Sequence, residues 1–220
     1  MGNDTAAPLA TPETESPDAQ PGKPDGSFGA WMFNKRGLVH PVFVVAALLT
    51  AGPDPELRTL ALVLMAVYVF LRLWAASHIG GAARVHSKKS RKKRTLITTG
   101  PFSIVRNPLY VANAAGLVGS CLLLGTPWLA AVSAVVVVIW YVVIVGWEAG
   151  VLEDLYGDEY VEYRKRVGGM FPRPRLRLPA FADLGQANLS LKKVLRKERG
   201  MLMIAAFMLA LGWLRVYLAS

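Results

Sequence analysis

The sequence R-T-L-I-T-T-G-P-F-S-I-V-R-N-P-L-Y at residues 94–110 lies between two apolar blocks and directly after a dense run of basic residues. Two dipeptides within it, Gly100-Pro101 and Asn107-Pro108, interrupt helical structure, because proline lacks an amide hydrogen and pushes the preceding residue out of the α region. We therefore expect the polar residues of this stretch on a bent segment beside an apolar region. A bent polar segment at a membrane surface can line a binding site.

The composition favours a membrane protein with several spans. The chain has 220 residues, of which 53% are hydrophobic, and a formal net charge of +10, with a mean hydropathy of +0.35. The apolar residues occur in long runs and not at amphipathic spacing, so the bilayer is the expected solvent for them. The single cysteine, Cys121, falls within such a run and is expected to be a packing residue. The predicted fold class is all-α, a polytopic helical membrane protein with about five transmembrane helices.

Five apolar segments are the predicted spans. Residues 38–51 are the shortest and cross a hydrocarbon core of ~30 Å only if residues 28–33 extend them. Residues 57–79 are long enough but contain Arg72, which is expected either to snorkel toward the basic end or to point inward at an anionic ligand. The remaining predicted spans are residues 110–124, 128–147 and 201–218.

The segments outside the spans suggest three regions. Residues 1–27 are rich in proline, acidic and small residues, so we expect a disordered N-terminal tail, and they lack the pattern of a signal peptide. Residues 28–174 are the predicted core, and residues 175–220 a basic linker with the final span. Within the core, residues 153–167 are expected to form an interfacial amphipathic helix with its tyrosines packed on one face.

Basic residues predict the orientation in the membrane. The run at residues 84–94 contains seven lysines and arginines, which favour the cytoplasmic side and attract anionic lipid head groups. No aromatic residues interleave these charges to stack bases, so nucleic acid is not an expected partner. This orientation places the N-terminus and the bent segment in the cytoplasm, and the acidic loop at residues 54–56 outside.

Two blocks of residues resemble the family of integral membrane isoprenylcysteine carboxyl methyltransferases and phospholipid methyltransferases. Its members carry the signature G-P-[YF]-x-x-x-R-[HN]-P-x-Y. A second block begins at Glu148 and continues through L-Y-G-D-E-Y-V-E-Y at residues 155–163 to Phe171-Pro172. The resemblance covers residues 96–174. The residues that match the signature are Gly100, Pro101, Phe102, Arg106, Asn107, Pro108 and Tyr110.

The resemblance implies S-adenosylmethionine as the cofactor and a membrane-embedded lipid or lipidated molecule as the methyl acceptor. Arg106 suits the carboxylate of the cofactor, and Glu148 suits its ammonium group or ribose hydroxyls. An apolar hairpin separates these two residues, so both can reach one pocket at the cytoplasmic face. The expected catalytic residues are Glu148 and Arg106. The expected cofactor-binding residues are Gly100, Pro101, Arg106, Asn107, Pro108, Tyr110 and Glu148.

Three positions depart from the family pattern. Asn107 replaces the commoner histidine, and Ala149 stands where a second glutamate is usual. Ile144 occupies the position where isoprenylcysteine enzymes carry an arginine, which favours a phospholipid amine as acceptor, with Glu148 as its base. Carboxyl O-methylation and an NADPH-dependent reduction of the membrane sterol type remain alternatives, although a glycine fingerprint for a nucleotide domain is absent. The sequence leaves the acceptor and the oligomeric state open. No metal site is expected, because no helical spacing relates His40, His78 and His86.

Overall fold

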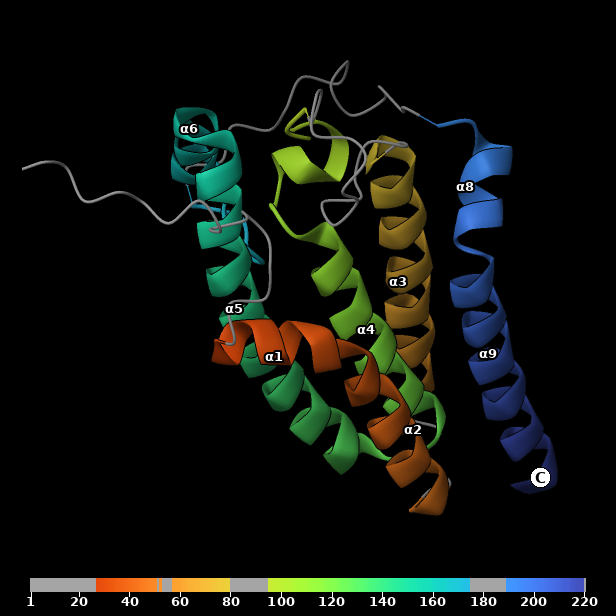
Figure 1. The fold of residues 1–220 in the computed structure, drawn as a ribbon. Helices are drawn as coiled ribbons and strands as arrows, with labels where there is room; N and C mark the ends of the chain where they lie inside the picture. Colours follow the sequence, from red (N-terminus) through yellow and green to blue (C-terminus); the bar gives the residue numbers. More distant parts are fainter. Residues whose placement is uncertain (1–26, 51, 53–56, 80–94, 175–188, 220) are drawn as a thin grey trace, which may run out of the picture.

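The structure, a computed structural model, describes residues 27–50, 52, 57–79, 95–174 and 189–219 (Figure 1). The predicted tail, apart from Ser27, lies outside these residues, as do the basic run at 84–94 and the acidic loop at 54–56. The described part is helical, which confirms the all-α class. Its elements are α1 (Phe28–Lys35), η1 (Arg36–Leu38), α2 (Val39–Leu49), α3 (Arg58–Ile79), η2 (Gly100–Ser103), α4 (Pro108–Leu123), α5 (Pro127–Tyr156), α6 (Asp158–Arg166), α8 (Leu191–Lys197) and α9 (Arg199–Ala219).

Three helical stretches of the described chain are long and apolar enough to cross a membrane. They are Phe28–Leu49, Arg58–Ile79 and Pro127–Tyr156, while α4 is a shorter apolar helix. The first stretch includes residues 28–33, but these belong to α1, which lies at a steep angle to α2 (Figure 1), so their expected extension of the shortest span stays a prediction. Helix α9 covers the predicted last span, and its passage through the membrane stays a prediction.

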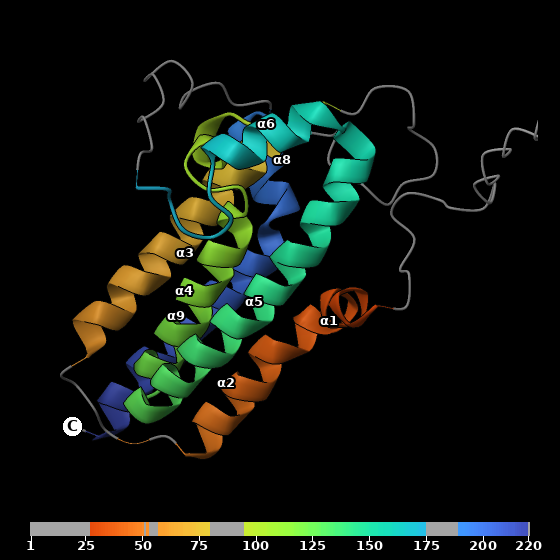
Figure 2. The same cartoon turned by 90° about the vertical axis from the view of Figure 1, so that its left-hand side faces the viewer.

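Helices α3, α4 and α5 lie side by side and form the centre of the bundle (Figures 1 and 2). Helix α4 approaches α3 closely because two of its residues are glycines. A Cβ atom on Gly116 would lie 2.8 Å from the ring of Tyr68, and one on Gly119 would lie 3.3 Å from the carbonyl oxygen of Ala61. Cys121 is fully buried in the same helix. The burial of Cys121 confirms its predicted packing role, and the small residues Gly116 and Gly119 allow the two helices to pack closely.

Helix α1 lies across α5 and at a steep angle to α2 (Figure 1). The 3₁₀ turn η1 connects α1 to α2. Gly29 lies directly against Trp147 of α5, where a Cβ atom would approach the Cβ of Trp147 to 2.5 Å. The indole of Trp140 donates a hydrogen bond of 3.2 Å to the carbonyl of Met32. These contacts hold the N-terminal helix against the middle of α5, around Trp140 and Trp147.

The end of α5 differs from the prediction. The helix continues past Trp147 to Tyr156, and Gly157, with φ of +56°, separates it from α6. A single interfacial helix over residues 153–167 is therefore wrong. The apolar run ends at Trp147, but helical hydrogen bonding does not require apolar side chains, and leucine and glutamate after this point favour the helix. Glu148 consequently lies inside α5 and not at its end.

Helices α8 and α9 pack on the opposite side of α3 and α4 from α5 (Figure 1). The amide of Leu189, just before α8, donates to the carbonyl of Ser77 near the end of α3. At the far end of α9, Arg215 donates to the carbonyl of Leu124 over 2.8 Å. The segment formed by α8 and α9 is thus fixed to the bundle just before α8 and near the end of α9.

Candidate functional site

The bent segment between η2 and α4 is held by main-chain hydrogen bonds. The amide of Arg106 donates to the carbonyl of Gly168 over 2.8 Å, and the amide of Asn107 donates to the carbonyl of Gly169 over 3.0 Å. Val105 and Gly168 also form an isolated parallel bridge. Asn107 then precedes Pro108, the first residue of α4, a position where proline's missing amide is not needed. The loop after α6 therefore fixes where Arg106 and Asn107 lie.

Two tyrosines of α6 hold the same segment through their hydroxyls. Arg106 donates from Nη1 to the hydroxyl of Tyr160 over 2.6 Å, and the hydroxyl of Tyr163 donates to the carbonyl of Phe102 over 2.6 Å. Both tyrosines are buried, and burial raises the pKa of each hydroxyl above its ordinary value, partly opposed by the charge of Arg106. The predicted packing role of these tyrosines is therefore incomplete, because their hydroxyls also bind the signature segment.

Tyr110 and Glu148 meet across the hairpin formed by α4 and α5. The hydroxyl of Tyr110 donates to Oε1 of Glu148 over 3.0 Å, although 38 residues separate the two. The ring of Tyr110 stacks on that of Tyr141 with centroids 4.6 Å apart, which fixes the phenol against α5. The prediction that an apolar hairpin returns Glu148 to the signature segment is confirmed.

These residues line one cavity of about 790 Å³, a size typical of small-molecule sites. Five of the predicted residues contribute to its wall: Arg106, Asn107, Pro108, Tyr110 and Glu148. Apolar side chains cover much of the remainder. The other lining residues are Phe33, Arg36, Arg72, Ile79, Thr95, Leu96, Ile97, Phe102, Leu109, Asn113, Trp147, Val151, Leu152 and Tyr156.

Gly100 and Pro101 are not among the residues that line this cavity. Both are buried, and Gly100 adopts a φ of +61°, which favours glycine. A Cβ atom on Gly100 would lie 2.5 Å from Nε2 of His78. In the described structure these two residues form the tight turn before the binding segment, and their cofactor-binding role stays a prediction.

Glu148 and Arg106 are two of the four charged residues in the cavity wall, and neither forms an ion pair among the described residues. Glu148 takes part in no ion pair within the described residues, and its side-chain partner there is the neutral hydroxyl of Tyr110. Arg106 likewise bonds to a neutral hydroxyl, and its buried Nε has no hydrogen-bond partner among the residues described. Uncompensated buried charges are costly, so such a pair suits a ligand with both a positive and a negative group.

Two of the departures from the family pattern lie away from the cavity. Ala149 is buried in a cluster with Tyr160, Tyr163 and Val167, so its side chain packs under α6. Ile144 is fully buried in the main core and does not line the cavity. The identity of residue 144 therefore does not set the charge of the cavity wall, and the argument from Ile144 to an amine acceptor loses its structural basis.

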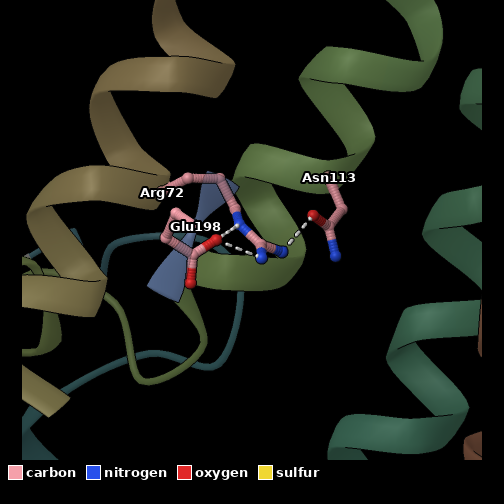
Figure 3. Close-up of polar contacts among 3 residues, drawn as sticks. All are labelled: Arg72, Asn113 and Glu198. Carbon is pink, nitrogen blue, oxygen red and sulfur yellow. Dashed lines mark hydrogen bonds and ion pairs between the residues drawn. The ribbon is translucent and has the colours of Figure 1, made fainter. Parts of the chain in front are cut away.

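Sequence reasoning missed two of the polar residues at the cavity and left the position of a third open. Asn113 follows Tyr110 by three positions in α4, so helical spacing could have identified it. Arg36 belongs to η1 and carries no sequence signal. Arg72 points inward, where its guanidinium bonds to Glu198 and to Asn113 (Figure 3). Arg72 therefore points inward and does not snorkel, but its observed anionic partner is the protein carboxylate of Glu198 and not the ligand that the inward alternative expected.

The described helices form a bundle with membrane-spanning length and composition in three stretches, and its cavity has both apolar and charged lining residues. The model of the phospholipid methyltransferase family matches residues 57–159. The predicted resemblance to phospholipid methyltransferases is therefore confirmed over α3, η2, α4 and α5.

Two curated bacterial proteins are also similar to this chain. The cobalt-zinc-cadmium resistance protein CzcN of Cupriavidus metallidurans is 32% identical over 120 residues, which are 54% of this chain and 51% of the relative. The nickel-cobalt-cadmium resistance protein NccN of Alcaligenes xylosoxydans xylosoxydans is 35% identical over 102 residues, which are 46% of this chain and 43% of the relative. The matches thus span about half of each relative. No solved structure matches the chain at a significant level.

The names of both relatives refer to metal resistance. Within the described ranges, no group of three or more histidine, cysteine, aspartate or glutamate residues could hold a metal ion. His40 bonds through Nε2 to the carbonyl of Asn113 over 3.0 Å, and His78 is buried against Gly100. His86 lies outside the described residues.

Proposed function

We propose that this protein transfers a methyl group from S-adenosylmethionine to a lipid or lipidated acceptor in the membrane. The observation that carries the proposal is the cavity in which Arg106, Asn107, Tyr110 and Glu148 meet, because these four residues lie within the segment that matches phospholipid methyltransferases. Its apolar wall suits a lipid chain, and its polar residues suit a charged cofactor.

The donor set fits the cofactor. Arg106 has a buried Nε without a partner in the described structure, which is a suitable donor for a carboxylate. Glu148 supplies a negative charge for an ammonium group, and Asn107 can donate and accept hydrogen bonds. When bound, S-adenosylmethionine supplies a methyl group on a cationic sulfur, and the residues of the cavity contribute orientation and exclusion of water.

Glu148 is the proposed base if the acceptor is an amine. An amine must lose a proton to attack, and the carboxylate of Glu148 can accept that proton at the cavity wall. Tyr110 donates to one carboxylate oxygen, Oε1, and so fixes the carboxylate while the second oxygen keeps its lone pairs for the acceptor. The proposed orientation of the cavity is cytoplasmic, where the cofactor is available.

Two other reactions need the same test. Carboxyl O-methylation uses an acceptor that is already ionised and requires no base, and an NADPH-dependent reduction uses a different cofactor. The names of the two relatives refer to metal resistance and specify no reaction, so we propose no metal substrate for this chain.

The test is to incubate the purified protein with methyl-labelled S-adenosylmethionine and vesicles that contain phosphatidylethanolamine, and to count label in extracted lipid. We expect base-stable label and a rate that rises with pH through the neutral range, because a free amine with a pKa near ~10 reacts only when deprotonated. Label released by mild base as methanol would indicate an ester and favour carboxyl methylation. Binding of NADPH without binding of S-adenosylmethionine would overturn the methyltransferase proposal.

A further inference from the structure

Arg72 is fixed at the cavity wall by two residues from distant parts of the chain (Figure 3). Its Nε and Nη2 donate to Oε2 of Glu198 over 3.1 Å and 2.6 Å. Its Nη1 donates to Oδ1 of Asn113 over 2.9 Å. The side chains of Arg72 and Glu198 are 22% and 9% exposed, so this ion pair is largely removed from solvent. The guanidinium therefore has one defined orientation at the site.

The guanidinium retains donors for a ligand. An arginine has five N–H donors, and the bonds to Glu198 and Asn113 use three of them within the described structure. Both Arg72 and Asn113 line the cavity, whereas Glu198 is not among its lining residues. Glu198 thus binds the arginine from outside the cavity wall, and two N–H donors of Arg72 keep no partner among the described residues.

The cavity wall has more arginines than the single carboxylate of the cofactor can bind. Its wall contains Arg36, Arg72 and Arg106 but only one carboxylate, that of Glu148. S-adenosylmethionine has a single carboxylate, and Arg106, with its unpartnered Nε, is the proposed partner for it. Glu198 neutralises Arg72 from outside the wall, so the three guanidinium groups exceed the two carboxylates by one positive charge. The sulfonium and ammonium groups of the cofactor would add to this excess, and we therefore expect a further anionic group from the second substrate.

We propose that Arg72 binds an oxyanion of the methyl acceptor, a phosphodiester or a carboxylate, and that Glu198 and Asn113 are positioning residues for it. This inference rests on the proposed methyl transfer and names the substrate class as an anionic lipid. A planar guanidinium can bind either oxyanion through two parallel hydrogen bonds. It also assigns a role in the site to Glu198, which lies outside the region that matches the methyltransferase family.

Two binding measurements test the proposal on the full chain in detergent. Isothermal titration with dihexanoyl phosphatidylethanolamine and, separately, with N-acetyl-S-farnesylcysteine distinguishes the phosphodiester from the carboxylate. For the oxyanion that binds, Arg72→Gln should lower affinity about tenfold or more, because a charged hydrogen bond is lost. Arg72→Lys should recover part of the affinity that Arg72→Gln loses, because lysine keeps the positive charge. Wild-type protein that binds neither compound would overturn the proposal.

Asn113→Asp separates oxyanion binding from a purely structural role of Arg72. The substitution keeps an acceptor for Nη1 of Arg72 and adds a negative charge beside it, so the tie between α3 and α4 is preserved or strengthened. If Arg72 binds the acceptor, this charge repels the oxyanion and affinity should fall about tenfold or more. Unchanged acceptor affinity in both Asn113→Asp and Arg72→Gln would show that Arg72 only fastens the helices, and would overturn the proposal.

Titration with S-adenosylmethionine distinguishes failure of this inference from failure of the proposed function. The Arg72 variants should bind the cofactor with wild-type affinity, and loss of cofactor binding in them would reassign Arg72 to the cofactor. A wild-type protein that binds no cofactor would contradict the proposed function, whereas the acceptor titrations would still test Arg72. Arg215→Gln is the matched control, because Arg215 bonds to the carbonyl of Leu124 at the other end of α9, and it should leave acceptor affinity unchanged.

Discussion

The hydroxyl of Tyr110 lies 3.0 Å from Oε1 of Glu148 and joins the first turn of α4 to the C-terminal third of α5. The two helices run in opposite directions, so the signature segment and the acidic residue share one end of the bundle (Figure 2). The carboxylate is held by a neutral donor, which leaves its charge for a ligand.

Replacement of Glu148 by glutamine should show how much the negative charge of this residue contributes to activity, because glutamine has nearly the same shape. Glu148→Gln keeps an oxygen that accepts from Tyr110 but removes the negative charge and the base, so methyl transfer to an amine acceptor should fall ~10²-fold or more. Cofactor affinity should fall by a smaller factor. The control is Tyr110→Phe, which removes the hydrogen bond but keeps the charge and should reduce turnover less. Wild-type turnover of the glutamine variant in the labelled-cofactor assay would contradict the proposed role of Glu148 as a base.

The loop that holds Arg106 and Asn107 should not tolerate a side chain at Gly168. A Cβ atom there would lie 1.9 Å from the carbonyl oxygen of Phe171, so Gly168→Ala forces the backbone to move and should cost about 1–3 kcal/mol of stability. Gly146→Ala is the matched control, because nothing lies within 4 Å of its added Cβ. In the interior of α5 this change should stabilise by about 0.5–1 kcal/mol.

The stability of both glycine variants is measured by thermal unfolding in detergent, and their cofactor affinity by titration. We expect Gly168→Ala to lower both the midpoint temperature and cofactor affinity, since it shifts the carbonyls that receive the amides of Arg106 and Asn107. Equal behaviour of the two variants would contradict the role assigned to this loop.

Stability should decline at alkaline pH because of the buried tyrosines of α6. Burial raises the pKa of Tyr163 above its ordinary value near 10, so the folded chain keeps a proton that the unfolded chain releases. The stabilisation is complete below pH ~10 and is lost as the pH rises further. Tyr163→Phe loses the bond to Phe102, which costs about 1 kcal/mol near neutral pH. Its midpoint temperature should then fall less steeply above pH ~10, and an unchanged slope would refute this assignment.

The described basic residues give a prediction for topology. Helix α8 carries Lys192, Lys193, Arg196 and Lys197 at the end of the bundle where α6 lies (Figure 1), which favours the cytoplasmic side. In a Cys121→Ala background, Ser190→Cys should react with an impermeant maleimide only after permeabilisation. Trp128→Cys, at the exposed start of α5, should react in intact cells. Reaction of both from the same side would reject the orientation.

Much of the arrangement was predictable because it depends on local chemistry. The prolines at 101 and 108 mark the bent segment and the start of α4, and Gly116 and Gly119 mark the close contact with α3. The hairpin of α4 and α5 follows from two apolar runs with a Gly-Thr-Pro turn between them. These features depend on residues close together in the sequence.

The parts that were not predictable depend on distant pairs. The bond between Arg106 and Tyr160 joins residues 54 positions apart, and that between Arg72 and Glu198 joins residues 126 positions apart. No local pattern specifies either partner. The end of α5 was misplaced because hydropathy reports where apolar residues stop, whereas a helix ends where its hydrogen bonds do, here at Gly157.

The pairing of Arg106 and Asn107 with Gly168 and Gly169 has a consequence for variation at the site. It uses peptide groups, which every residue other than proline possesses in the same form. Position 107 can therefore exchange asparagine for histidine while the segment keeps its place. At position 106 the side chain also bonds to Tyr160, so ligand preference and backbone placement are more separable at position 107, where a new specificity can arise without a new fold.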